Sequence, residues 1–440
     1  MDQQAFYRLA DHLHSLLRGD EAFTAWLAAE DTDFIRFNHG RVRQAGSVSQ
    51  AYLDLQWLRG ARHISETVAL SGTAADLERV SRLVGELRSL LDQVPDDPYL
   101  LLNTEPHNSQ HLAVSRLPSA ESMVDDIVSA AAGDDLVGVL AAGPMRYGFA
   151  NSWGQRNWHE SASWNFDWSL YAHGDKAVKR GGAGFEWDAS LLKTSLARAR
   201  EELALLRRPV KPLSPGRYRA FMTPSALSEL VQMFNWAGFS EKEIRAKRSA
   251  MLRLTTGEAT LSPRCHLYED TAGGLGPAFQ RQGFIKPARV DLVQNGRFAS
   301  SLVSPRSARQ YGVASNGAGA EEGAESLALG PGDLPMAKAL AALDTGLYIS
   351  NLWYLNYSDR GAARVTGMTR FACFWVENGQ IVAPLDVMRF DDSLYRLLGD
   401  QLEALTCETE LLADPNSYGA RLSHSIRVPG ALLSGLQLVS

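Results

Sequence analysis

The sequence predicts an α+β protein, in which an N-terminal domain of mixed helices and strands precedes a β-rich C-terminal domain of hairpins with a few helices. In the N-terminal half, apolar residues recur at helical spacing in some segments and alternate with polar residues in others, and these periods distinguish helices from strands. In the C-terminal half, Asn295-Gly296 and Asn378-Gly379 each join β-branched and aromatic runs. Both pairs predict β-hairpins, because Asn-Gly tolerates the positive φ angles of a type I′ turn.

A proline-rich segment predicts the domain boundary. The chain has 440 residues, and a single hydrophobic core rarely grows beyond about 250–300 residues, so the length favours two to three domains. Three prolines fall within residues 207–216, and clustered prolines are typical of linkers between domains. We therefore expect an N-terminal domain over residues 1–208 and a C-terminal domain over residues 209–440.

The spacing of apolar residues predicts the N-terminal helices and strands, and turn residues and prolines predict where they end. We expect, in order, a helix bearing Phe6, Leu9 and Leu13; a turn at 31–33; strand and turn over 34–41; a strand over 51–57; a helix bearing Leu77, Val80, Val84, Leu87 and Leu91; a loop over 95–120; a short helix bearing Val124 and Ile127; strands over 136–187; and a helix over 188–206.

Aromatic residues alternate with polar ones between residues 164 and 168, where Trp164, Phe166 and Trp168 enclose Asn165 and Asp167. Period-two spacing predicts one buried face of a sheet. The alternative is an aromatic surface that stacks bases or grips peptide side chains. We favour the buried face.

In the C-terminal half, residues 218–222 predict a strand, and Thr223-Pro224 supplies an N-cap and a first-turn proline for the helix that follows. Gly238 is expected to stop that helix. Glycine-rich segments at 272–276 and 312–332 separate the later strands. Because the second mixes Gly, Ala, Ser and Glu without periodicity, we expect it to be mobile.

The composition is that of a soluble globular protein, with 45% hydrophobic and 21% charged residues. No run approaches the roughly 18 apolar residues that span a bilayer, and no signal peptide is recognised at the start. The net charge of −6 gives no attraction to nucleic acid. We therefore expect a cytoplasmic protein that binds neither nucleic acid nor membrane, and whose three cysteines (Cys265, Cys373, Cys407) are reduced.

Several landmarks, in this order and spacing, together resemble the TldD/PmbA family, and specifically its TldE (PmbA) branch, formerly described as modulators of DNA gyrase. The landmarks are Phe37-Asn38-His39-Gly40-Arg41-Val42, Gly148-Phe149-Ala150-Asn151-Ser152-Trp153-Gly154, Asn295-Gly296, Ser315-Asn316-Gly317 and Phe374-Trp375-Val376-Glu377-Asn378-Gly379. The chain departs from the family at 281–283, where an acidic turn is usual, and at 356–361. These departures suggest a divergent member with a dedicated partner.

The resemblance implies a peptidase made of two kinds of subunit. The TldD subunit is a zinc peptidase whose helix carries HExxxH, and the corresponding hexapeptide here runs from Ser228 through Glu229 to Met233. Serine and methionine are not usual zinc ligands, and without a metal-bound water Glu229 has no nucleophile to activate. We therefore expect no catalytic residue, metal or cofactor in this chain, zinc in the partner, and Glu229 as a surface or interface carboxylate.

The resemblance then implies a non-catalytic TldE-like subunit, which pairs with a TldD-like metallopeptidase and helps to enclose unfolded or leader peptides. One alternative is an autonomous peptidase with an unrecognised metal site. Another is a protein that binds and modulates gyrase or a toxin. Whether the chain forms homodimers without its partner is open at this point.

Three further groups of residues are not expected to form functional sites. His107 and His111 are spaced for one face of a helix, but Pro106 favours a solvated loop. Cys265-His266 cannot form a nucleophile–base pair if the two are neighbours in a strand, because their side chains then point to opposite faces. The glycines at 273–276 lack the frame of a phosphate loop, and we expect a flexible loop there.

Overall fold

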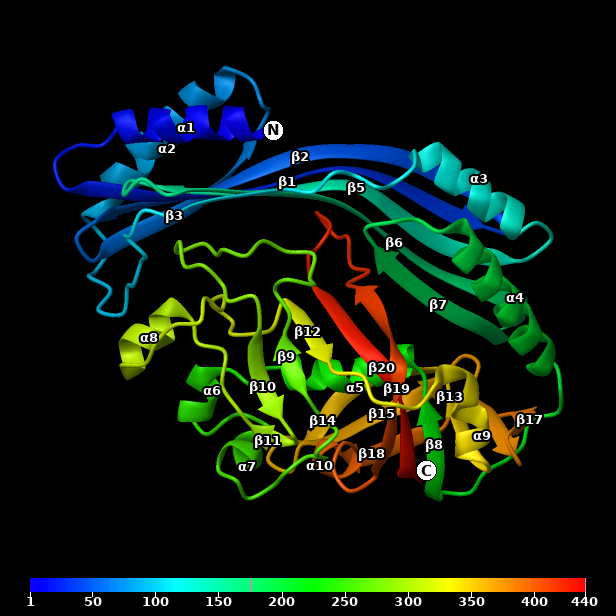
Figure 1. The fold of residues 1–440 in the computed structure, drawn as a ribbon. Helices are drawn as coiled ribbons and strands as arrows, with labels where there is room; N and C mark the ends of the chain where they lie inside the picture. Colours follow the sequence, from blue (N-terminus) through cyan, green and yellow to red (C-terminus); the bar gives the residue numbers. More distant parts are fainter. Residues whose placement is uncertain (175, 440) are drawn as a thin grey trace.

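The computed structural model describes residues 1–174 and 176–439. Seven strands from the first half form one sheet, and thirteen strands from the second half form another. The first sheet arches over the second half of the chain (Figure 1). This arrangement confirms the α+β class, with a β-rich second half. Among the described helices, none is long and apolar enough to cross a membrane.

The first half alternates short helices with long strands. Its elements are α1 (Gln3–Ser15), β1 (Glu21–Asn38), β2 (Arg41–Arg59), β3 (Arg62–Leu70), α2 (Ala75–Leu91), β4 (Asn108–Leu112), α3 (Ala120–Ala130), β5 (Leu136–Asn151), β6 (Arg156–His173), β7 (Lys176–Gly184) and α4 (Ala189–Leu205). The strand order is β3-β2-β1-β5-β6-β4, and β7 also pairs with β6. Only β4 runs parallel to its neighbour.

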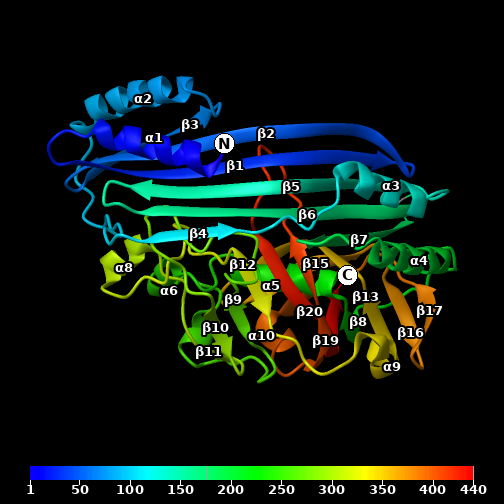
Figure 2. The ribbon, with the colours of Figure 1, turned by 45° about the horizontal axis from the view of Figure 1, so that its top comes forward.

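Helices cover the convex face of this sheet at both ends, with α1 and α2 at one end and α3 and α4 at the other (Figure 2). Phe23, Leu27 and other apolar residues of β1 and β2 pack against α1 and α2. Phe166 and Trp168 of β6 pack in a second cluster with residues of α3 and α4. The predicted buried aromatic face is therefore confirmed, and the polar residues between these aromatics face the concave side.

The second half contains more strands and shorter helices. Its elements are β8 (Gly216–Met222), α5 (Pro224–Asn235), α6 (Glu241–Arg245), α7 (Leu252–Thr255), β9 (Leu267–Glu269), β10 (Val290–Gln294), β11 (Arg297–Phe298), α8 (Pro305–Tyr311), β12 (Ser326–Leu329), the 3₁₀ helix η1 (Met336–Lys338), α9 (Ala339–Leu343), β13 (Gly346–Ile349), β14 (Asn351–Asp359), β15 (Arg364–Arg370), β16 (Phe374–Glu377), β17 (Gln380–Pro384), β18 (Arg389–Ser393), α10 (Leu394–Leu397), β19 (Leu402–Ala413) and β20 (Ser425–Val439).

Both predicted Asn-Gly hairpins are confirmed. β10 pairs with β11 across Asn295-Gly296, and β16 pairs with β17 across Asn378-Gly379. All four turn residues have positive φ, between 48° and 73°. Thr223 caps α5 as expected, because its hydroxyl accepts a hydrogen bond from the amide of Ala226. The strands change sheet between β7 and β8, but the division into domains at residue 208 stays a prediction.

Two sequence-based expectations in the first half are wrong, and one strand was missed. The expected turn at 31–33 lies inside β1, because the side chains of Asp31 and Asp33 accept hydrogen bonds from Ser49 and Ser47 across the β1–β2 pair. The strand β3 was not expected. The predicted loop over 95–120 contains β4, which pairs with β6.

The two glycine-rich segments make close contacts with the rest of the chain. Residues 312–332 include β12, whose four residues are all buried. Glu322, which belongs to this segment and is 1% exposed, accepts hydrogen bonds from the hydroxyls of Ser240 and Ser304, which lie outside it. Gly274 lies so close to β12 that an added Cβ would be 1.8 Å from the Oγ of Ser326. Residues 312–332 therefore contain a buried strand that was not expected, and residues 273–276 form a loop, as predicted, whereas the mobility of both segments stays a prediction.

Candidate functional site

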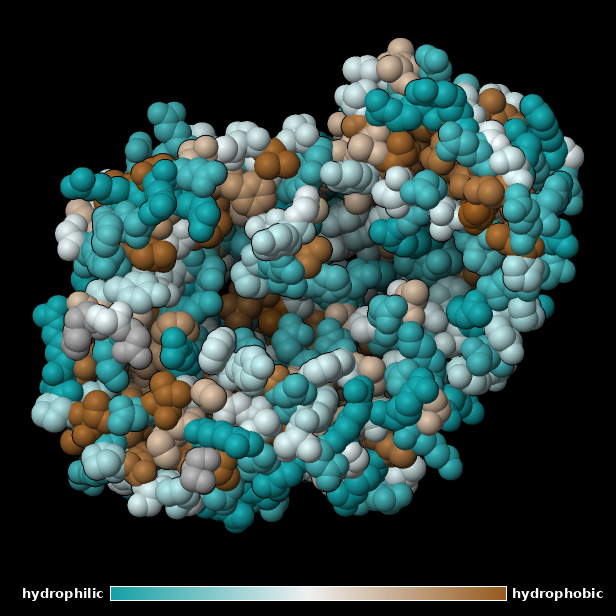
Figure 3. Space-filling model, turned by 180° about the vertical axis from the view of Figure 1, so that it is seen from behind, coloured by the Kyte–Doolittle hydropathy of each residue, from teal (hydrophilic) through white to brown (hydrophobic). Residues whose placement is uncertain are grey.

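The candidate site is the cleft between the concave face of the first sheet and the second half of the chain. Seen from behind, the surface is hollowed between these two parts (Figure 3). The concave face of β6 carries a row of polar residues, which alternate with the buried aromatic residues of the other face. Two cavities lie along this row. Residues 165–167 of β6 line one cavity, residues 158–162 of β6 contribute to the other, and Ser163 lies between these two sets.

Arg421 contacts Ser163, which lies between the β6 residues that line the two cavities. Arg421 lies in the connection between β19 and β20, and its side chain is 7% exposed. Its guanidinium donates hydrogen bonds to the carbonyl oxygens of Gly143 and Ser163, both at 3.1 Å, and to the Oγ of Ser163 at 2.9 Å. The main-chain amide of Arg421 donates to Oε1 of Glu30 at 3.3 Å. The connection thus touches β1, β5 and β6 and crosses the cleft.

The first cavity, which we call the α5 cavity, has a volume of about 570 Å³. Its walls come from β6 and β7, from α5, from the start of β14, and from both sides of the β19–β20 connection. Polar and apolar residues both line it, and the polar ones are Asn165, Asp167, Lys179, Arg180, Ser225, Ser228, Glu229, Gln232, Asn235, Asn351, Asp414, His424 and Ser425. A space of this size holds a small ligand or several residues of an extended peptide.

Glu229 projects from α5 into this cavity, where its side chain remains accessible to solvent. The surrounding protein raises the pKa of its carboxyl above the usual value, because removal of water disfavours the charged form. The positive charge of Lys179 opposes this change. Glu229 is therefore a solvent-accessible carboxylate on the wall of the cavity.

The residues of α5 do not fit a zinc ion. The hydroxyl of Ser228 donates a hydrogen bond to the carbonyl of Ser225 at 2.8 Å, and Met233 is 5% exposed within the hydrophobic core. Neither supplies the imidazole or thiolate that zinc prefers. Across residues 1–174 and 176–439, no group of three or more histidine, cysteine, aspartate or glutamate side chains could hold a metal.

The second cavity, which we call the His159 cavity, has a volume of about 1000 Å³. His159 on β6 and His111 on β4 stack in it, with ring centroids 4.8 Å apart and planes 15° from parallel. Burial, together with the nearby charges of His111 and Lys286, lowers the pKa of His159 to about 4. His159 is therefore neutral near pH 7. The expectation of a solvated loop for His107 and His111 is wrong for His111, which belongs to β4.

Cys265 and His266 do not form a pair. The thiol of Cys265 is buried and donates to the carbonyl of Leu398, and burial raises its pKa to about 12. The Nδ1 of His266 instead accepts a hydrogen bond from the amide of Asn295. The sequence analysis did not identify Arg421, Asn351 or His159, whose positions depend on contacts between distant segments. The only local signal was the polar row of β6.

The fold and the cleft together define a two-sheet α+β protein with two cavities along one strand of the first sheet. Residues 215–440 match the PmbA/TldA metallopeptidase C-terminal domain. This match spans half of the chain, and the chain belongs to the PmbA/TldA family, as the sequence landmarks indicated. A comparison with curated proteins found no match.

Solved structures share the fold over almost the whole chain. TldE from Thermococcus kodakarensis has a TM-score of 0.81 at 15% sequence identity, covering 99% of this chain and 100% of that one. A proposed modulator of a DNA gyrase from Thermotoga maritima has a TM-score of 0.77, with the same identity and coverage. A proposed modulator of DNA gyrase from Bacteroides thetaiotaomicron has a TM-score of 0.74 at 15% identity, covering 99% and 98%. At this identity, the likeness shows the fold alone.

Proposed function

We propose that this chain is a TldE-like, non-catalytic subunit of a cytoplasmic peptidase. In this proposal it pairs with a TldD-like subunit that holds the zinc ion, and the two together process unfolded or leader peptides. The observation that carries the proposal is the chemistry of α5. This helix follows β8 and its Thr223 cap, but it presents Ser228 and Met233 where the catalytic subunit is expected to have histidines.

The residue types at the motif positions of α5 support the proposal. Glu229 is the one member of the expected motif that remains, and it lines the cavity. A general base needs a nucleophile within hydrogen-bonding reach. The lining residues supply no zinc site that could generate one.

The shape of the cleft supports binding of an extended peptide. The two cavities are about 570 and 1000 Å³ in volume and follow the same polar face of β6. Extended peptides bind through main-chain hydrogen bonds, which place little demand on sequence. A folded protein would not fit into spaces of this size, so we expect the substrate to be unfolded.

The proposal is tested by co-expression with a TldD-like protein from the same genome. We expect one complex to co-purify with both chains in equal amounts, and we expect this chain without its partner to show no peptidase activity. Failure of the two chains to associate at micromolar concentration would overturn the proposal. Size-exclusion chromatography of this chain alone would show whether it also forms homodimers.

A further inference from the structure

We infer that a second copy of this chain pairs with the exposed edge of β2, so that the first sheets of two chains join into one antiparallel sheet. The strand β2 spans Arg41–Arg59, but β3 covers its outer edge only from Ala51 to Arg59. Across residues 1–174 and 176–439, no strand pairs with this edge from 41 to 50, although β1 pairs with the inner edge. Figure 2 shows no helix or strand beyond this half of β2.

This edge lacks the features that usually prevent strand pairing. Exposed edges are commonly protected by charged residues, prolines, β-bulges or a covering element. The β1–β2 register shifts near the hairpin end and leaves Arg43 without a partner on β1. Beyond this bulge, residues 44–50 read Gln-Ala-Gly-Ser-Val-Ser-Gln, with no charge and no proline. All seven are exposed except Val48 and Gln50, which are half-buried.

A second copy fits this edge because the segment 44–50 is self-complementary. Two identical antiparallel strands in one sheet are related by a twofold axis perpendicular to the sheet, so the middle residue, Ser47, lies opposite its own copy. Gln44 then lies opposite Gln50 of the second copy, and no charged residue lies opposite another. The paired segment ends at the Arg43 bulge of one chain, where β3 of the other chain takes over the edge.

The charges beside this segment are complementary in the same register. On β1, Arg36 lies opposite Gln44, and Glu30 lies opposite Gln50, whose amide donates to the carboxylate of Glu30 at 2.6 Å. Directly opposed residues of antiparallel strands share one face. Pairing therefore gives a row from the exposed Arg36 through Gln44 to Gln50 and Glu30 of the second copy. The twofold axis forms this row twice, each time with a cation at one end and a carboxylate at the other.

Pairing at this edge leaves the cleft open. The strand order β3-β2-β1-β5-β6 separates the edge of β2 from β6 by two strands, and β6 is the strand of the first sheet that lines both cavities. Two copies can therefore join through β2 while each keeps its own cleft. This inference goes beyond the proposed function and does not depend on it.

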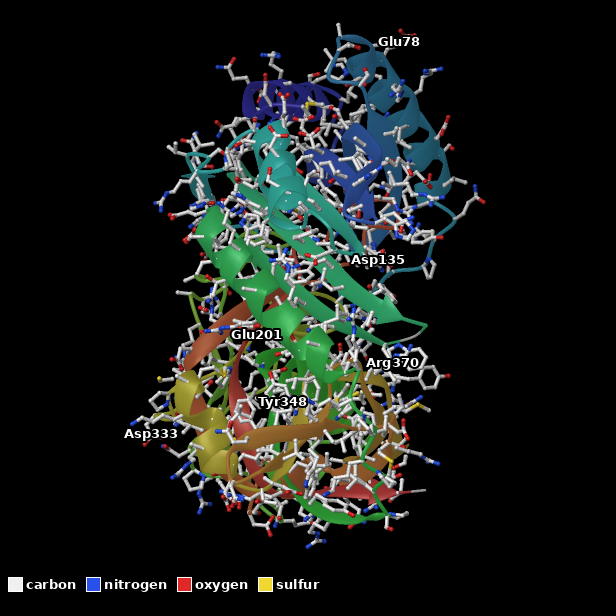
Figure 4. All side chains as sticks on the ribbon, turned by 90° about the vertical axis from the view of Figure 1, so that its right-hand side faces the viewer. Glu78, Asp135, Glu201, Asp333, Tyr348 and Arg370 are labelled. Carbon is white, nitrogen blue, oxygen red and sulfur yellow. The ribbon has the colours of Figure 1, made fainter. Side chains whose placement is uncertain are left out.

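Disulfide cross-linking of the full-length chain tests the register. Directly opposed Cβ atoms lie about 4.5–5.5 Å apart, which is close to the spacing of a disulfide, so Ser47→Cys should link two copies on oxidation. The background carries Cys407→Ser, because the other two cysteines are buried. Glu78→Cys is the control, since Glu78 is exposed on α2 at the outer end of the molecule, away from the second half (Figure 4). We expect a linked dimer from Ser47→Cys and little from Glu78→Cys.

Sedimentation velocity of the chain without other proteins tests the association itself. Ser47→Lys and Ser47→Glu each place two like charges opposite one another at the twofold axis, where they repel. We expect a wild-type dimer at micromolar concentration and at least about a tenfold weaker dimer for each variant. An equal mixture of the two variants should regain the dimer, because opposite charges then face each other. Circular dichroism checks that both variants are folded.

Several results would overturn the inference. One is a wild-type chain that stays monomeric, and another is equal cross-linking of Ser47→Cys and Glu78→Cys. A dimer that neither charged variant weakens would show that another surface is used, and a mixture that does not regain the dimer would contradict the register. If the wild type is monomeric and Ser47→Lys loses a TldD-like subunit, the edge belongs to that subunit instead. Failure of the wild type to co-purify with that subunit overturns only the proposed function.

Discussion

The guanidinium of Arg421 is hydrogen-bonded to both the main-chain carbonyl and the hydroxyl of Ser163, at 3.1 and 2.9 Å. These residues are 258 positions apart in the chain. Ser163 lies at the middle of the polar face of β6, between the residues that line the two cavities. The contact therefore fixes the β19–β20 connection across the cleft, between the parts of β6 that line the two cavities.

Substitution of Arg421 tests this contact. Arg421→Ala removes three hydrogen bonds and leaves buried acceptors on Gly143 and Ser163 without donors. Because hydrogen bonds to charged groups contribute about 1.5–3 kcal/mol each, partly offset by the desolvation of the charge, we expect the free energy of unfolding to fall by about 2–3 kcal/mol. Urea denaturation measures the change. Arg8→Ala, at an exposed position on α1, is the control, and an equal loss in both variants would contradict the account.

The close approach of Gly274 to β12 gives a second prediction. An alanine Cβ at this position would lie 1.8 Å from the Oγ and 2.6 Å from the Cβ of Ser326, so the backbone of the loop must move. Overpacking of this kind costs about 1–3 kcal/mol. We expect Gly274→Ala to lower the midpoint of thermal unfolding. Gly46→Ala meets no atom within 4 Å and should leave the midpoint unchanged; a similar midpoint for both variants would show that the loop is flexible.

Glu269 makes stability depend on pH. It is 6% exposed on β9, both carboxylate oxygens accept from the amide of Ser326, and burial raises its pKa to about 7 despite nearby Lys286. The folded state therefore holds the proton more tightly than the unfolded state, whose pKa is near 4.5. The protonated group's contribution to stability is complete below about pH 4.5 and is lost as the pH rises to about 7.

Glu269→Gln removes this titration, because a neutral amide keeps its charge state at every pH. Relative to the variant, the wild type should lose on the order of 3 kcal/mol of unfolding free energy between pH 4.5 and pH 8. Denaturation series at several pH values measure the difference, with Glu78→Gln as the control. A constant difference between wild type and Glu269→Gln over this range would show that Glu269 is ionised throughout.

Restoring the two histidines on α5 should not restore a metal site. Ser228 lines the cavity, whereas Met233 is 5% exposed and packs in the hydrophobic core, so the double variant Ser228→His/Met233→His directs only one imidazole to the cavity and buries the other in the core. Loss of the Met233 packing and burial of a polar ring should cost about 2–4 kcal/mol. Elemental analysis should find much less than one zinc per chain. One zinc per chain would show that α5 can turn its motif face toward the cavity.

The sequence predicted the elements whose cause is local. The Asn378-Gly379 turn depends on two residues that accept positive φ, and the start of α5 depends on the Thr223 cap followed by proline. The alternation of residues 164–168 correctly placed the aromatic side chains on a buried face. Each of these features is determined by residues within one turn or one strand.

The features that were missed depend on distant partners. Nothing local marks residues 31–33 as part of β1, because their extended form is stabilised by hydrogen bonds to Ser47 and Ser49 on β2. β4 forms only because β6 offers it an edge. Nothing near Arg421 in the sequence indicates that it is buried, because its partners Gly143 and Ser163 lie on distant strands. The candidate site is made almost entirely of such contacts, so the sequence predicted Glu229 but not its surroundings.

We propose that this chain contributes to a peptidase without holding its metal. The most direct test assays an unstructured peptide with this chain, with a TldD-like subunit, and with both, while zinc is measured in each sample. We predict zinc in the partner and hydrolysis that needs both chains. Stoichiometric zinc and hydrolysis by this chain alone would contradict the claim, and would mean that residues other than Ser228, Glu229 and Met233 hold the metal.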